Sequence, residues 1–304
     1  MILSSYIGHF RSLRSLVILV AAIASCNFSF AQTPPFGETA TNPSATTNVA
    51  SRGRGFRGPM RPADKPSPRT DKNSQLAHEQ LLEKAKKGGI DIYFEGDSIT
   101  RRWGATDYPQ FLANWNTNFF GWNAADFGWG ADSIENMLWR LENGELDGVN
   151  PKIIVILGGI NNVGTFPGGD EKVENITRGI KALVKICQEK APNAVIILTA
   201  LFPRNDNMAV VPEINKINEN IAAMADGKKI RYLNVNDKLV DNDGKQFPGM
   251  FVDRLHPTLK GYQVWADGLK PIFTEILGPP AATDHAPPPT GDPSASVKKA
   301  PSQP

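Results

Sequence analysis

The run Ile153-Ile154-Val155-Ile156-Leu157 is apolar at every position and consists mostly of β-branched residues. A strand that is apolar on both faces is typical of a parallel sheet that helices cover on both sides. The other strand candidates are residues 90–94, 123–127, 194–201 and 230–235, and amphipathic helical patterns span residues 133–146, 171–190, 211–225 and 258–277. This alternation predicts a three-layer α/β/α sandwich with a central parallel sheet of about five strands.

The first 31 residues have the features of a secretory signal peptide. Arg11 and Arg14 precede the apolar run 16–24, which is too short to span a bilayer. Two cleavage sites fit this pattern. Cleavage after Ala31 follows the ordinary small-residue rule, whereas cleavage before Cys26, at a sequence similar to a bacterial lipobox, would leave a lipid-anchored cysteine. Either site predicts an exported protein, periplasmic or extracellular.

Residues 32–73 and 279–304 flank the candidate domain and are rich in Pro, Gly and small polar residues. Such segments cannot bury enough apolar surface to offset the entropy lost on ordering, so we expect both to be disordered. Residues 74–278 then form one domain. Basic residues concentrate in the first flanking segment and the domain itself is mildly acidic, so a nucleic-acid partner is not favoured.

Two short segments suggest an activated serine. Gly96-Asp97-Ser98 follows the strand candidate 90–94, which puts Ser98 at the carboxyl edge of the sheet, where open α/β proteins bind ligands. Asp253 precedes His256 by three residues, so one turn can hold both side chains together. The three residues are therefore candidates for nucleophile, base and orienting acid. The alternative is that Asp253 makes a local turn hydrogen bond and that His256 is a surface residue.

Two more Gly-rich loops, residues 128–132 and 158–162, follow the next two strand candidates. In a parallel sheet all three loops leave the same edge, where backbone N–H groups can point at an anion. Ordinary strand-to-helix turns also favour Gly and Asn, so neither loop alone indicates a site. No cluster of His, Cys and Asp has the spacing of metal ligands, so we expect neither a metal nor a cofactor.

In these blocks, and across essentially the whole predicted domain, the sequence resembles the SGNH, or GDSL-type, hydrolases. Residues 137–146 are similar to the catalytic subunits of platelet-activating-factor acetylhydrolase. The resemblance implies a flavodoxin-like SGNH hydrolase fold in which Ser98 is the nucleophile and Asp253 and His256 complete a triad.

The same resemblance implies an oxyanion hole. Its donors would be the Ser98 N–H, a backbone N–H of the second loop, and the side-chain amide of Asn161. That branch of the family usually has Gly immediately before the Asp of the second loop, where this chain has Ala131. We therefore expect Ala131 to be the second donor, with Gly130 as the alternative.

These features predict an exported serine esterase for short acyl groups, with acetyl esters of glycans as the leading substrates. Trp129 and Phe166 are candidates to stack on a sugar ring, although a Trp in such a loop as often packs against the protein. A lipid or phospholipid acetyl ester hydrolase and a non-catalytic glycan-binding module are the alternatives. A nucleotide-binding protein is disfavoured, since no G-x-x-x-x-G-K-[ST] loop follows Phe94.

Overall fold

The computed structural model describes residues 60–294. The predicted signal peptide, with the candidate lipid anchor at Cys26, lies outside the described residues, as do residues 32–59 of the predicted linker and residues 295–304 of the predicted tail. Within the described part of the chain, none of the helices is long and apolar enough to cross a membrane.

A single parallel sheet forms the centre of the fold and confirms the predicted architecture. Its strands are β1 (Ile92–Gly96), β2 (Ala124–Asp126), β3 (Ile153–Leu157), β4 (Val195–Thr199) and β5 (Ile230–Leu233). They are hydrogen-bonded in the order β2-β1-β3-β4-β5, with every pair parallel. The chain therefore leaves β1 toward one edge and returns past it to β3. The carboxyl ends of β1 and β3 meet at the reversal point, where such sheets bind ligands.

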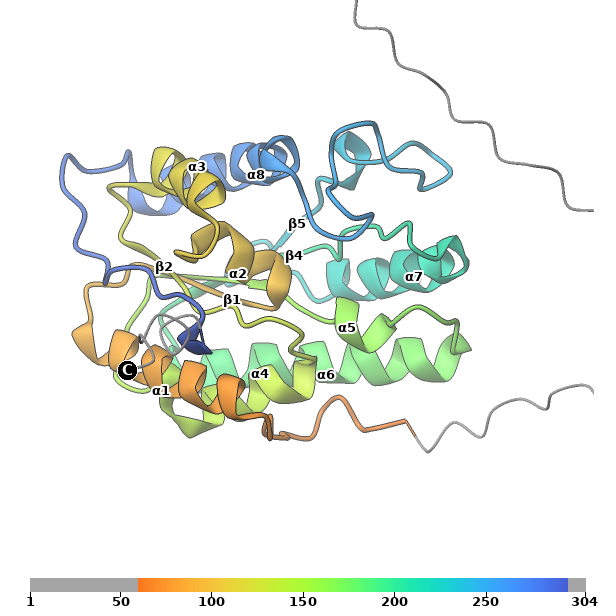
Figure 1. Ribbon diagram of the computed structural model, residues 1–304, viewed down its shortest axis with the longest axis horizontal. Helices are drawn as coiled ribbons and strands as arrows, with labels where there is room; N and C mark the ends of the chain where they lie inside the picture. The colour runs from red at the N-terminus through yellow and green to blue at the C-terminus, as the bar shows by residue number, and fades with distance from the viewer. Residues whose placement is uncertain (1–59, 295–304) are drawn as a thin grey trace, which may run out of the picture. The chain divides into compact units, whose positions relative to one another are not determined.

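Helices cover both faces of this sheet (Figure 1). Among the described residues the α-helices are α1 (Lys72–Lys87), α2 (Ser98–Gly104), α3 (Pro109–Phe119), α4 (Ile134–Arg140), α5 (Ile160–Val163), α6 (Gly169–Lys190), α7 (Val211–Ala222) and α8 (Leu259–Leu277). On one face α3 packs against α8, and on the other α6 packs against α4 and α7. Right-handed crossovers require this division, because the connections before and after the reversal run in opposite directions.

The predicted helices differ from the observed ones for local reasons. The pattern at 133–146 becomes α4 followed by a π-helical turn, η1 (Leu141–Glu145), because Gly144 leaves the helical conformation with φ 111°. The short helices α2 and α5 follow β1 and β3 directly and hold too few turns for an apolar period to predict them. Helix α8 continues through Pro271 as one element.

Aromatic rings fill the space between the sheet and helices α2, α3 and α8. Phe94 of β1 lies among Trp103, Trp115, Phe119 and Trp265, with ring centroids 4.7 to 6.4 Å apart. This packing holds α2 against the end of β1. Ser98, the first residue of α2, is therefore attached to a rigid part of the core.

Residues 60–71 pack against the domain, which corrects the expectation of disorder for this end of the predicted linker. Ala63 is fully buried, and its N–H donates to the side-chain oxygen of Asn175 on α6 at 3.1 Å. The amide nitrogen of Asn175 donates to the Arg61 carbonyl at 2.9 Å. A few specific polar contacts hold the segment, and composition does not reveal them.

Residues 279–294 are also ordered, which corrects the same expectation for this part of the tail. Asp284 accepts hydrogen bonds from the N–H groups of Gly121 and Asn123, at 2.7 and 3.3 Å. The following prolines, Pro287–Pro289, help close a cavity of about 290 Å³ against α3 and β2, and no candidate catalytic residue lines it. The tail thus covers the β2 edge of the sheet.

Replacing Asp284 tests whether the tail is docked. Asp284→Ala should lower the free energy of unfolding by about 1–3 kcal/mol, because the N–H groups of Gly121, Asn123 and Ala286 lose their carboxylate acceptor. Urea denaturation measures that loss, and limited proteolysis should show faster cleavage within residues 279–294. Asp243→Ala, at an exposed carboxylate, serves as the control. Unchanged stability and cleavage would contradict the docked position.

Candidate active site

The turn between β1 and α2 sets the position of Ser98. Gly96 ends the strand, and a Cβ added there would lie 2.7 Å from the Leu157 carbonyl oxygen, so the turn requires glycine. Asp97 caps the helix by accepting the Ile99 N–H at 2.9 Å. Burial raises the pKa of the Asp97 carboxyl to about 7. Asp97 therefore has the contacts of a structural residue that presents Ser98 at the helix start.

His256 and Asp253 lie on the loop before α8 and face Ser98. The Nε2 atom of His256 is 2.9 Å from the Ser98 Oγ. The Nδ1 atom lies 2.7 Å from Asp253 Oδ2, and the His256 backbone N–H donates to Asp253 Oδ1 at 2.8 Å. A proton on Nδ1, facing the carboxylate, leaves the Nε2 lone pair for the serine hydroxyl. The structure thus brings together the three residues that the sequence selected.

The charges of this group suit a neutral imidazole beside an ionised carboxylate. Burial, together with the positive charge of Arg102, holds the pKa of His256 below its ordinary 6.5, although Asp253 opposes this shift. Partial burial disfavours ionisation of Asp253, but hydrogen bonds from the His256 N–H and ring outweigh it and lower the pKa of the carboxyl. At neutral pH His256 can therefore accept a proton.

Arg102 is a residue that the sequence reasoning missed. Its guanidinium Nη1 lies 3.4 Å from Asp253 Oδ2, the carboxylate oxygen that also faces the His256 ring. Arg102 follows Ser98 by four residues on α2, and residues at this helical spacing share a face. That spacing is the signal that could have identified it.

The candidate oxyanion donors lie on three different elements. The Ser98 N–H stands at the start of α2, and neither it nor the Ala131 N–H donates to another group within residues 60–294. The Asn161 Nδ2 atom, on α5, donates one hydrogen to the Asp132 carbonyl at 2.8 Å and keeps a second. The Asn161 amide is thereby attached to the loop that carries Ala131.

Ala131, rather than Gly130, has the backbone conformation for which glycine is favoured. Its φ is 63°, and for a residue with a Cβ this left-handed region costs about 1–2 kcal/mol. Such strain persists where the surroundings fix the conformation. Gly130 instead uses its carbonyl, which accepts a hydrogen bond from Arg69 at 3.1 Å.

The two candidate sugar-stacking residues have different environments. Trp129 is buried: its Nε1 donates to Ser74 Oγ at 2.8 Å, and the Arg101 guanidinium lies 4.7 Å from its ring centroid. This packing against α1 and α2 corrects the expectation that Trp129 stacks on substrate. Phe166 lies on the loop after α5 with 60% of its surface exposed. It stays a candidate contact.

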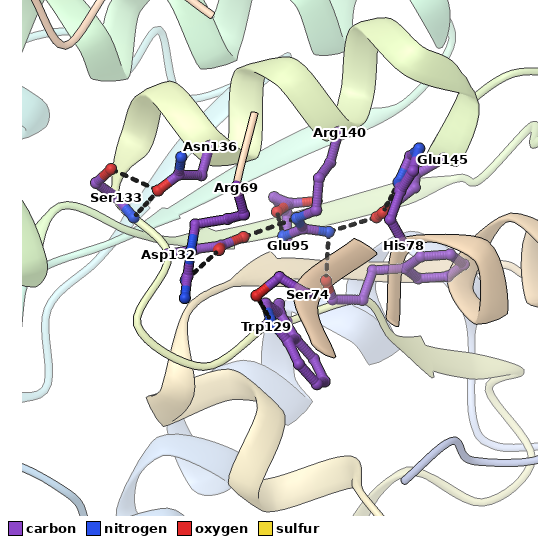
Figure 2. Close-up of polar contacts among 12 residues, drawn as sticks. Arg69, Ser74, His78, Glu95, Trp129, Asp132, Ser133, Asn136, Arg140 and Glu145 are labelled. Atoms are coloured by element: carbon purple, nitrogen blue, oxygen red, sulfur yellow. Dashed lines mark hydrogen bonds and ion pairs between the residues drawn. The ribbon is translucent and has the colours of Figure 1, made fainter. Parts of the chain in front are cut away.

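A buried arginine binds the loop of residues 128–132 through Asp132. Arg140 of α4 contacts Asp132, Glu95 and Glu145, as Figure 2 shows. Asp132 is fully buried and follows Ala131 directly, so this ion pair reaches the base of the candidate oxyanion loop. Across residues 60–294 no group of three or more His, Cys, Asp or Glu side chains is arranged to hold a metal ion.

Comparison with known proteins decides the family. The profile of the GDSL-like lipase/acylhydrolase family matches residues 94–264. The chain belongs to this family. Platelet-activating factor acetylhydrolase IB subunit alpha1 of Bos taurus is 30% identical, over 78% of this chain and 99% of that protein. The subunit beta homolog of Drosophila melanogaster is 30% identical, over 68% and 88% of the two chains.

A solved structure supports the fold. A GDSL-like lipase from Bacteroides thetaiotaomicron superposes with a TM-score of 0.53 and 18% sequence identity, covering 66% of this chain and 98% of the other. Its match confirms the helix-covered parallel sheet of an SGNH hydrolase. The family match confirms the resemblance inferred from the sequence. Membership of this acylhydrolase family supports an ester hydrolase activity.

The pKa of His256 gives a prediction for the pH dependence of ester cleavage. If His256 is the base, ester cleavage needs its neutral imidazole, so kcat/KM should rise with pH and reach half its plateau below pH 6.5, the ordinary pKa of His. Arg102→Gln removes a positive charge that disfavours the imidazolium, so the midpoint should move to higher pH. Arg231→Gln, which breaks a surface pair with Glu275, is the control. If the pH midpoint of kcat/KM in Arg102→Gln equals that of the wild type, Arg102 does not have this role.

Proposed function

We propose that this protein is a serine esterase that cleaves short acyl esters, with Ser98, His256 and Asp253 as its catalytic triad. The observation that carries the proposal is the chain of hydrogen bonds from Ser98 Oγ through both ring nitrogens of His256 to Asp253. A serine hydroxyl becomes nucleophilic when a positioned base takes its proton, and an oriented imidazole supplies that base.

The reaction proceeds in two steps. The Ser98 Oγ attacks the ester carbonyl carbon as its proton passes to His256 Nε2, and Asp253 stabilises the imidazolium. The tetrahedral intermediate collapses as His256 returns the proton to the leaving alcohol, which leaves an acyl group on Ser98. Water then attacks this acyl-enzyme, with His256 again as the base, and the carboxylic acid and free Ser98 result.

The negative oxygen of the tetrahedral intermediate would be stabilised by the N–H groups of Ser98 and Ala131 and by the Asn161 amide. Backbone donors that meet no other partner in the described chain suit this task, because they need no rearrangement before the charge develops. The second hydrogen of the Asn161 amide is available for the same oxygen, since the first binds the Asp132 carbonyl.

The proposed substrates are acetyl esters, with acetylated glycans first. The names of the relatives support the acetyl group, since they are platelet-activating factor acetylhydrolase subunits. Those names also favour a second candidate, an acetyl ester on a lipid or phospholipid. The choice of a glycan substrate depends on export, which we propose from the signal-like residues 1–31. In a variant of this proposal, Cys26 carries a lipid anchor. A non-catalytic glycan-binding module is disfavoured by the complete set of reacting residues.

The ester series from p-nitrophenyl acetate to octanoate tests the nucleophile and the acyl preference. We expect fastest cleavage of the acetate, and a loss in kcat of about 10⁴-fold or more in both Ser98→Ala and His256→Ala, because the triad acts as a unit. His285→Ala, at an exposed tail histidine, should keep full activity. Activity that survives in Ser98→Ala would exclude this nucleophile. Acetylated oligosaccharide and an acetylated phospholipid then distinguish the two substrate classes.

The oxyanion assignment predicts a loss in kcat with little change in KM. Asn161→Ala should lower kcat by about 10²–10³-fold, since one donor to the transition state is lost. The matched control is Asn162→Ala on the same turn, where the side chain binds the Ile134 N–H and Glu135 at the start of α4. That variant should lower the unfolding temperature and affect kcat less. Equal kcat losses in the two variants would contradict the assignment.

A further inference from the structure

The segment before the family region reaches the candidate oxyanion loop. The family profile begins at residue 94, yet Arg69 donates from Nη1 to the Gly130 carbonyl at 3.1 Å and to Asp132 Oδ1 at 3.3 Å. Ser74, at the start of α1, accepts the Trp129 indole N–H at 2.8 Å. Figure 2 shows these side chains together on one side of the loop.

Arg69 is itself held in place. Its Nε and Nη2 atoms contact Asp71 Oδ2 at 3.0 and 2.9 Å, which holds one edge of the guanidinium and leaves Nη1 for the loop. Asp71 in turn caps α1 by accepting the Ser74 N–H at 2.9 Å. The side chain of Arg69 is about 29% exposed, so the contact is partly shielded from water. Helix α1 therefore provides a fixed base from which Arg69 binds the loop.

The Gly130 carbonyl and the Ala131 N–H belong to the same peptide group. A peptide is planar and trans, so its C=O and N–H point in opposite directions. A donor that holds the carbonyl therefore also fixes the direction of the N–H. The hydrogen bond polarises the peptide as well, which strengthens the N–H as a donor. Because Ala131 is strained at φ 63°, the peptide would relax to another orientation without such a restraint.

We propose that Arg69 is a positioning residue that aims the Ala131 N–H at the oxyanion. The proposal rests on the proposed function, because the oxyanion exists only if an ester is attacked. Arg140 fixes the other oxygen of Asp132 at 2.7 Å, and Asn161 holds its carbonyl. Arg69, in contrast, binds the Gly130 carbonyl, which belongs to the proposed donor peptide itself.

The test compares Arg69→Ala, Arg69→Lys and the wild type, each as the full chain, with p-nitrophenyl acetate. We expect Arg69→Ala to lower kcat by about 10–100-fold and to change KM less than about twofold. This loss is smaller than the loss for a removed oxyanion donor, because the Ala131 N–H is misdirected and not deleted. Arg69→Lys keeps a cationic donor and should recover part of kcat. Arg231→Ala is the matched control: its carboxylate pair has a similar exposure, 28% against 29%, and it should leave kcat unchanged.

Hydrogen–deuterium exchange of a peptide covering residues 128–133 gives a readout that does not need activity. Faster exchange in Arg69→Ala than in the wild type, with kcat lowered as above, supports the proposal. Unchanged exchange overturns it, and so does faster exchange with an unchanged kcat. A wild type that cleaves no ester would overturn the proposed function and the catalytic part of this inference, while exchange would still decide whether Arg69 restrains the loop.

Discussion

The site depends on one buried cation. Arg140 is 3% exposed, and its guanidinium binds Glu95 at 2.6 Å, Asp132 at 2.7 Å and Glu145. Burial raises the pKa of Glu95 well above its usual range and that of Asp132 to about 6, whereas the positive charge of Arg140 acts in the opposite direction on both carboxyls. Removing Arg140 would leave these carboxyls buried without their partner, and breaking a buried pair in this way costs about 3–5 kcal/mol.

The Arg140 contacts connect the two halves of the proposed chemistry. Glu95 lies on β1, three residues before Ser98, and Asp132 follows Ala131. The proposed nucleophile and the proposed oxyanion loop are therefore attached to the same guanidinium, from the ends of neighbouring strands. His256 is fixed separately, by the loop before α8, and the Tyr262 hydroxyl of that helix donates to the Ile99 carbonyl at 2.7 Å. The proposed base is thus aligned with Ser98 by packing on the opposite face of the sheet.

The sequence predicted what short-range patterns encode. Apolar runs identified the five strands, and the loop after β1, with the Asp-x-x-His turn, identified residues that the structure brings together. The loop after β3 identified Asn161, which binds the Asp132 carbonyl of the second loop. Contacts between distant segments were not predictable. Arg69 belongs to a basic, Pro-rich stretch that has the composition of a linker, and only the fold brings it to Gly130. The role of Trp129 could not be decided from the sequence for the same reason, because nothing local shows that α1 covers it.

Ala131 shows how these long-range contacts matter to the chemistry. A glycine at this position would accept the left-handed conformation without strain, whereas alanine needs the loop to be held from outside. Arg69 and Ser74 provide part of that restraint, and both lie before the region that the family profile matches. Changes in the N-terminal segment can therefore adjust the proposed donor peptide and leave Ser98, His256 and Asp253 untouched. In this chain the geometry of the proposed oxyanion loop is a property of the whole described domain, and the motifs of the candidate triad alone do not determine it.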